Sequence, residues 1–384
     1  MPNELRKILL DTFRDGYQKT MSRRQKSKLI DDFIFATNGR YRCRKYVSKI
    51  LSGKVTPVRF KKPGPKVKYG PEVVKPLFHL WLHMNKICSK RMKAAIPIWL
   101  PYLKDLDPTI EDLLLQVSAS TIDRLLKPFK KQRGLSTTRA SMLKSSIPIK
   151  LLDGFVTEPG HIEVDTVSHC GNSVAGTFIS SLTAMDLFSG WTENRAAMSK
   201  ASEDMLPAIK SAQSKMPFNL RTWSSDNGVE FINNVVVKYL QSKNIQVIRR
   251  RPYKKNDAAH VEQKNWTHVR ELFGYSRFED RELMLLMNEI YTAYWNPLQN
   301  FFMPMMKLKA KTRIGGKIVK QYDTPKTPYQ RLIDSRKLDR TQKMRLSSQK
   351  EGKNPFTLKK QLEIKLKLFF SLVERKRNRP KEVA

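Results

Sequence analysis

The sequence predicts an α/β domain built on a mixed sheet, with basic helical segments before it and a basic module after it. The charge is distributed unevenly. Residues 1–150 hold 33 Lys or Arg against 11 Asp or Glu, residues 151–300 hold 16 against 17, and residues 301–384 hold 24 against 7. The middle segment contains three strand-like runs followed by alternating helical and strand-like runs, which is typical of an α/β domain. The first segment instead repeats apolar residues at helical spacing.

The formal net charge of +38 indicates a polyanionic partner, which in the cytoplasm means nucleic acid. The three cysteines, Cys43, Cys88 and Cys170, lie far apart, which argues against a disulfide framework or a zinc knuckle and fits a reducing cytoplasm. No apolar run approaches the roughly 20 residues of a membrane span, and the first residues lack the apolar core of a signal peptide. We therefore expect a cytoplasmic protein that binds DNA and no membrane.

Residues 1–60 are predicted to form a helix–turn–helix domain that binds DNA. Ser22 is the expected N-cap of the first helix, Asn38-Gly39 ends it, and Gly53 ends the second helix. A helix pair whose second helix is basic is a shape that reads DNA. The candidate DNA contacts on this second helix are Arg42, Arg44, Lys45 and Lys49.

Residues 61–150 are predicted to form a linker and a second helical DNA-binding segment. The run "KKPGPKVKYGP" (61–71) is either a plain linker or an arm for the minor groove. Ser118 or Ser120 is the expected N-cap of a short helix that Pro128 ends. His79 and His83 have the spacing of two metal ligands, but no third ligand accompanies them in the sequence, and we favour a structural role.

Residues 151–300 are predicted to form the α/β core. The expected strands are 161–169, 176–186, 190–198, 220–226 and 245–250, and the expected helices are 202–216, the segment after Gly228, and 257–274. Residues 301–384 are predicted to form a small β-rich module with turns at Pro325 and Pro328, followed by mostly helical residues 336–376 and a basic tail.

Three carboxylates stand at informative places in this core. Asp226 follows a strand and precedes a helix, Asp165 lies within the first strand, and Glu262 lies on the last helix; 60 and 35 residues separate them in turn. A carboxylate inside a central strand is costly unless it is paired, hydrogen-bonded or metal-bound. Carboxylates are the ligands that Mg²⁺ prefers, and two divalent ions can cleave or transfer a phosphodiester.

Other polar residues are weaker candidates. We expect Glu163 to be a neighbour of Asp165, and Glu230, Asp186 and Asp257 to be surface or capping groups. His161, His169 and His260 could also lie near divalent ions bound by these carboxylates, and His260 is the best placed of the three. A basic cluster before the Glu262 helix favours contact with DNA phosphates. Its members are Arg249, Arg250, Arg251, Lys254 and Lys255, and Lys264 on the helix is a further candidate DNA contact.

The run from "SSDNGVEF" to "RRRPYKKNDAAHVEQKNW" resembles the integrase core of DDE transposases and retroviral-type integrases, and the flanks resemble those of insertion-sequence transposases. The resemblance implies an RNase H-like core with a mixed five-stranded sheet. It implies that Asp165, Asp226 and Glu262 are catalytic and bind two Mg²⁺ or Mn²⁺ ions. The sequence departs from the family at Ala258-Ala259, where Asn-Gly is frequent, and at Val269, where Lys or Arg is frequent.

The resemblance implies a transposase that cuts DNA at transposon ends and joins the freed 3′-hydroxyl to target DNA. Its partners would be the terminal inverted repeats and target DNA, held by a homo-oligomer at the bacterial nucleoid. One alternative is an RNase H-like nuclease without strand transfer. The other is a non-catalytic DNA-binding protein derived from a transposase.

Overall fold

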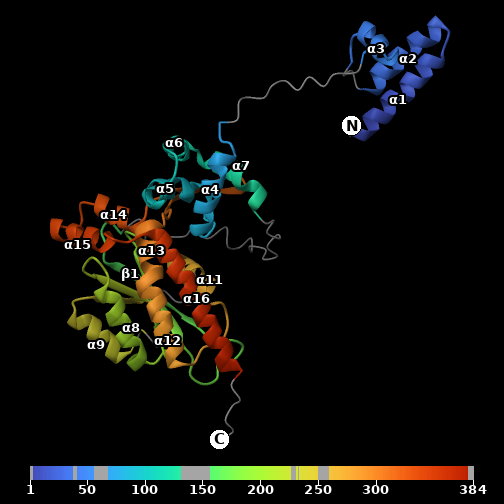
Figure 1. The fold of residues 1–384 in the computed structure, drawn as a ribbon. Helices are drawn as coiled ribbons and strands as arrows, with labels where there is room; N and C mark the ends of the chain where they lie inside the picture. Colours follow the sequence, from blue (N-terminus) through green and yellow to red (C-terminus); the bar gives the residue numbers. More distant parts are fainter. Residues whose placement is uncertain are drawn as a thin grey trace. The chain divides into compact units, whose positions relative to one another are not determined.

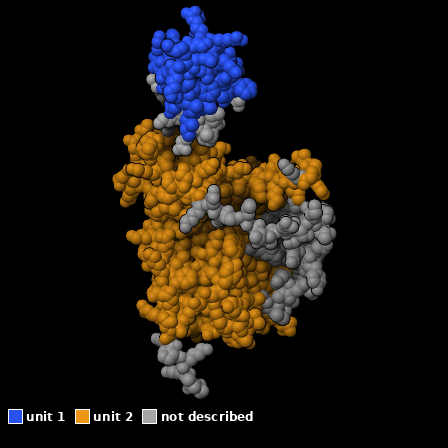
Figure 2. All heavy atoms as spheres, turned by 90° about the vertical axis from the view of Figure 1, so that its right-hand side faces the viewer, with its two compact units in different colours: residues 1–68 blue, residues 69–384 orange. Residues whose placement is uncertain are grey.

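The computed structural model describes residues 3–37, 41–55, 68–130, 156–225, 231, 233–249 and 259–378 (Figure 1). The chain forms two compact units, Met1–Lys68 and Tyr69–Ala384 (Figure 2). None of the helices in these described ranges combines the length and apolarity that crossing a membrane requires.

The first unit is a bundle of α1 (Asn3–Lys19), α2 (Arg23–Ala36) and α3 (Arg44–Leu51). Its core consists of Ile30 and Phe33 from α2 and Val47 and Leu51 from α3. The predicted helix pair is confirmed, and α1 is an addition that the sequence analysis did not assign. Ser22 is the N-cap residue of α2, as predicted, although its side chain makes no capping hydrogen bond.

The second unit begins with four helices that pack onto the α/β core. They are α4 (Pro71–His83), α5 (Ser89–Trp99), α6 (Pro108–Gln116) and α7 (Ala119–Leu126), with 3₁₀ turns at Leu100–Tyr102 and Lys127–Phe129. The Trp99 indole donates to the Phe302 carbonyl at 2.9 Å, and Ser118 caps α7 by accepting from the Thr121 amide. This helical segment and the core therefore share one hydrophobic interior.

A five-stranded mixed sheet lies at the centre of this unit (Figure 1). Its strands are β1 (His161–Ser168), β2 (Ser180–Asp186), β3 (Thr192–Ala197), β4 (Thr222–Ser225) and β5 (Gln246–Arg249), in the order β3-β2-β1-β4-β5. The first three strands are antiparallel, whereas β4 and β5 run parallel to β1. This is the RNase H-like arrangement, and it confirms the predicted fold class.

Helices cover the sheet. They are α8 (Ser202–Ser214), α9 (Asn234–Ser242), α10 (Ala259–Lys264), the π-helix η6 (Asn265–Arg270), α11 (Glu271–Phe273), α12 (Arg281–Glu289), the π-helix η7 (Ile290–Trp295) and α13 (Asn296–Phe302). The predicted helix 257–274 is thus interrupted by a π-helical stretch, and Gly274 ends it with φ +71°. The sequence analysis assigned no element to residues 281–302, which continue as helix from the Asp280 cap.

The chain ends in a hairpin, β6 (Leu308–Ile314) and β7 (Lys317–Tyr322), and three helices, α14 (Pro328–Asp334), α15 (Arg340–Lys350) and α16 (Pro355–Arg377). Pro328 starts α14 behind a Thr327 capping box, so the turn predicted there was wrong, because proline is well suited to the first helical position. The long helix α16 packs its Phe369 between Phe273 and Phe278 and so closes the core.

Candidate active site

A polar row crosses three strands, from the central strand β1 to the edge strand β3. Asp165 of the central strand β1 pairs in register with Thr183 of β2, and Thr183 pairs with Asn194 of β3. The Asn194 amide donates to the Thr183 hydroxyl at 2.9 Å. Because residues directly opposite one another point to the same face of a sheet, these three side chains lie on one face.

The half-buried carboxylate of Asp165 accepts hydrogen bonds at both oxygens. Oδ1 accepts from the Thr166 amide at 2.8 Å, and Oδ2 accepts from the side-chain amide of Asn265 at 2.7 Å. These bonds offset the cost of placing a carboxylate within a central strand.

Asn265 also locates the helix that carries Glu262. Glu262 belongs to α10, and Asn265 follows it by three residues at the start of η6. Residues three apart lie on the same side of a helix. The turn that contains Glu262 therefore packs on the strand that contains Asp165, although the Glu262 side chain itself lies outside the described residues.

The strand that precedes Asp226 is the parallel neighbour of β1. The register pairs Glu163 with Ser224, and β4 ends at Ser225. Asp226 comes next in the sequence and lies outside the described residues. Within the described ranges, no three His, Cys, Asp or Glu side chains gather closely enough to hold a metal ion, so the predicted triad stays a prediction.

A buried chain of polar contacts continues from the row into the Glu262 helix. His268 contacts the Asn194 side chain through Nδ1 at 3.0 Å and the Lys264 ammonium through Nε2 at 3.2 Å. Burial first, and then the charges of Lys264 and Arg91, hold the pKa of His268 well below its usual range. His268 is therefore neutral and ties the helix to the sheet. The Lys264 ammonium group faces this interior contact. The DNA contact predicted for Lys264 is not tested and stays a prediction.

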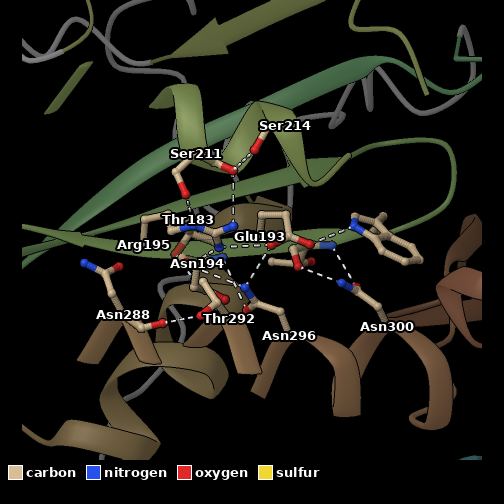
Figure 3. A network of polar contacts seen from close by, with 12 residues as sticks. Thr183, Glu193, Asn194, Arg195, Ser211, Ser214, Asn288, Thr292, Asn296 and Asn300 are labelled. Atoms are coloured by element: carbon tan, nitrogen blue, oxygen red, sulfur yellow. Dashed lines mark hydrogen bonds and ion pairs between the residues drawn. The ribbon is translucent and has the colours of Figure 1, made fainter. Parts of the chain in front are cut away.

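The side chains either side of Asn194 contact helices that Figure 3 shows on opposite sides of β3. Glu193 and Arg195 form a buried ion pair of 3.0 Å. Arg195 also donates to Ser211 of α8 at 2.8 Å, and Asn296 of α13 donates to Glu193 at 3.0 Å. Successive residues of a strand point to opposite faces. The strand β3 therefore fixes α8 on one face and, through Asn194, the Glu262 helix on the other.

The weaker candidates that the structure describes are buried or make contacts that stabilise the fold. Glu163 is buried. Asp186 is fully buried and accepts from the amides of Gly160 and Ser189, so it caps a turn, and the alternative of a surface position was wrong. His169 is buried against the Ser181 hydroxyl, and His161 contacts Thr222. Glu230, Asp257 and the His260 side chain lie outside the described residues.

The rings of His79 and His83 contact each other, and both contact Phe356, which agrees with the structural role favoured for them. The basic candidates of the first unit are exposed on or next to α3: Arg42, Arg44, Lys45 and Lys49. Arg44 also bonds Ser27 and Asp31 of α2. Arg249 ends β5, and its side chain lies outside the described residues, as do Arg250, Arg251, Lys254 and Lys255. All these DNA contacts stay predictions.

The sequence analysis missed Asn265 and the Thr183–Asn194–His268 contacts. The spacing of Asn265 from Glu262 was a usable signal, because three residues make nearly one helical turn. The contacts of Asn194 and His268 depend on strand register and left no pattern in the sequence.

The five-stranded sheet has the RNase H-like strand order. The model of the integrase core domain family matches residues 157–255. A relative from Sinorhizobium fredii, the uncharacterized protein y4rM, is 35% identical over 341 residues, which cover 85% of this chain and 94% of the relative.

Two solved structures are also similar. One is the dimeric form of the HTLV-2 integrase catalytic core domain in complex with magnesium. It is 16% identical to this chain, the match covers 39% of this chain and 92% of the HTLV-2 chain, and the TM-score is 0.29. The core domain of BIV integrase is 18% identical, covers 44% of this chain and 91% of its own, and has a TM-score of 0.27. The chain therefore contains an integrase core domain and belongs to the same family as the y4rM protein.

Proposed function

We propose that the protein is a transposase that cleaves DNA at transposon ends and transfers the freed 3′-hydroxyl into target DNA. The observation that carries this proposal is the hydrogen bond from Asn265 to Asp165. It brings the helix turn of Glu262 onto the central strand of an RNase H-like sheet. The 60- and 35-residue separations of Asp165, Asp226 and Glu262 support the same assignment.

The surroundings of Asp165 fit a hard divalent cation. The carboxylate of Asp165 accepts from the side chain of Asn265, and Oδ1 of Asn265 is buried with no hydrogen-bond partner in the described part of the chain. Oxygen donors of this kind suit Mg²⁺ or Mn²⁺. The similarity to an integrase core that was solved with magnesium favours the same ion.

In this proposal Asp165, Asp226 and Glu262 hold two such ions. Bound there, a metal pair supplies an activated attacking oxygen and stabilises the leaving oxyanion. Asn265 orients the Asp165 carboxylate, and His268 keeps the Glu262 helix in place. The basic cluster before α10, from Arg249 to Lys255, binds the phosphates that flank the cut.

The DNA partners follow from charge. The segments before and after the near-neutral core carry most of the +38 net charge, and we propose that they bind the terminal inverted repeats and target DNA. Related integrase cores occur in dimeric and trimeric forms, which favours a homo-oligomer that holds both ends at the bacterial nucleoid. DNA binding of this kind weakens steeply with salt.

A strand-transfer assay tests the proposal. Labelled duplexes that carry the sequences flanking the gene are incubated with Mg²⁺ and a supercoiled target. We expect cleaved and joined products from the wild type, and neither from Asp165→Asn, Asp226→Asn or Glu262→Gln, while all three variants still bind the ends. Cleavage without joining would identify a nuclease, and binding without either step would identify a non-catalytic binder. Normal activity of Asp226→Asn would overturn the site assignment.

A further inference from the structure

Two aromatic side chains are exposed beside the Glu262 helix. Trp266 is 52% exposed and Tyr275 is 62% exposed, and their ring centroids lie 6.4 Å apart. The guanidinium of Arg270 lies over the Tyr275 ring, 4.6 Å from its centroid. The same helix buries Val269 and Phe273 in the core, so Trp266 and Tyr275 are not part of its packing. Exposed large apolar groups that cluster mark interaction sites.

The surroundings of these rings hold them in place. Arg270 donates to the carbonyl of Ser168 at 3.1 Å and to the carbonyl of Gly274 at 3.2 Å. Gly274 has φ +71° and ψ −150°, a conformation that only glycine adopts readily. The chain therefore turns sharply after the helix and presents Tyr275 next to Arg270. A platform fixed in this way loses little conformational entropy when a ligand stacks on it.

The platform lies close to the candidate catalytic strand. Trp266 directly follows Asn265, which binds Asp165. Arg270 is bonded to Ser168, the last residue of β1. Ser168 is three residues beyond Asp165, which corresponds to about 10 Å along a strand. That distance matches about three steps of 3.4 Å along one strand of duplex DNA.

The chemistry of the platform selects its occupant. Two aromatic faces and a guanidinium suit a flat π system that is attached to a negative charge, which describes a nucleobase next to its phosphate. A base within a duplex has both faces covered by its neighbours, so only an unstacked base can use such a surface. An apolar protein segment would have no need of the arginine.

We propose that Trp266, Arg270 and Tyr275 form a stacking platform for an unpaired base within a few nucleotides of the cleaved phosphate. This inference rests on the proposed function, because it places DNA at Asp165. The platform holds the end of the duplex open beside the carboxylates, so part of the binding energy is spent on separating the terminal base pairs.

The test compares Trp266→Phe, which keeps an aromatic face, with Trp266→Leu, which keeps apolar volume without one. Leu285→Ala, which truncates another exposed side chain of the same unit (57% exposed), is the control. Each protein is assayed in single turnovers on fully paired duplexes of the sequences flanking the gene, and on duplexes with mismatched terminal bases. Thermal melting checks that all variants are folded.

We expect Trp266→Leu to cleave paired ends roughly 5- to 150-fold more slowly than the wild type, the range of losing one stacked base. Mismatched ends should restore most of the loss, and Trp266→Phe and Leu285→Ala should resemble the wild type. Equal rates for Trp266→Leu and the wild type on both kinds of end would overturn the platform. An equal loss on paired and mismatched ends would overturn the role in holding an unpaired base.

A second measurement separates this inference from the proposed function. In the Asp165→Asn background, 2-aminopurine is placed at successive positions near the end of the duplex, and its fluorescence is followed on binding. Stacking on the platform predicts a change in fluorescence at one to three positions that Trp266→Leu removes. This readout needs no cleavage, so a wild type that binds ends without cutting them would refute the transposase while still testing the platform. Identical fluorescence for both proteins would refute the platform alone.

Discussion

Asn265 donates a 2.7 Å hydrogen bond to Oδ2 of Asp165 across 100 residues of chain. This single contact joins the central strand to the helix that carries Glu262, and it orients a carboxylate that we assign to metal binding. In the proposed function, Asn265 would therefore act by positioning the Asp165 carboxylate and not by contacting DNA.

The first prediction concerns this contact. Asn265→Ala should lower cleavage about 10- to 100-fold, the usual effect of removing a group that orients a metal ligand. The Mg²⁺ concentration for half-maximal activity should rise, whereas DNA binding should not change. Gln263→Ala, an exposed neighbour on the same helix, is the matched control. If the Mg²⁺ dependence of Asn265→Ala equals that of the wild type, Asn265 has no orienting role.

The second prediction concerns the buried ion pair of β3. Its partners Arg195 and Glu193 have side chains that are 2% and 6% exposed. Glu193→Ala should lower the free energy of unfolding by about 3–5 kcal/mol, because it leaves the Arg195 charge buried without its partner. Lys326→Ala breaks the exposed pair with Asp334 and should cost about 0–1 kcal/mol. Urea titration of both variants measures the difference, and similar losses would show that burial does not distinguish the pairs.

The third prediction is a pH dependence. Burial, with a smaller effect from Arg270, lowers the pKa of His169 from 6.5 to about 3. Between these values the unfolded chain binds a proton that the native protein does not, so stability falls as pH falls below 6.5. His169→Gln should remove about 1.4 kcal/mol per pH unit of this slope between pH 6 and 4. Urea titrations across that range provide the measurement. Equal slopes in the two proteins would contradict the prediction.

The fourth prediction uses the division between the two compact units. Removing residues 1–68 should leave the melting temperature of the remaining chain nearly unchanged and remove most of the specific binding to the ends. Removing residues 1–150 should also lower the melting temperature, because it uncovers the apolar surface under Trp99 and breaks its bond to Phe302. Thermal melting and gel-shift titrations test both truncations. Equal melting temperatures would contradict the shared core.

The strands and the fold class could be predicted from the sequence, because runs of β-branched residues and a switch to helical spacing are local signals. All five strands lie within the ranges predicted for them. The helical path over 281–302 was missed because its segment Ile290–Trp295 is π-helical and shifts the apolar spacing. The partners of Asp165 were missed because Asn265 reaches it only through the packing of α10 on β1, which no local pattern specifies.

The π-helix η6 makes the length of the Glu262 helix a determinant of the site. Its hydrogen bonds join residues five apart instead of four. The segment Asn265–Arg270 therefore contains one residue more than a regular α-helix would place between the same neighbours. Deleting one residue there would restore the α-helical period and rotate everything before it by about 100° relative to Val269 and Phe273. Asn265 would then turn away from Asp165 with no side chain altered. For the proposed site, the spacing between Glu262 and the core would thus matter as much as the identity of the carboxylates.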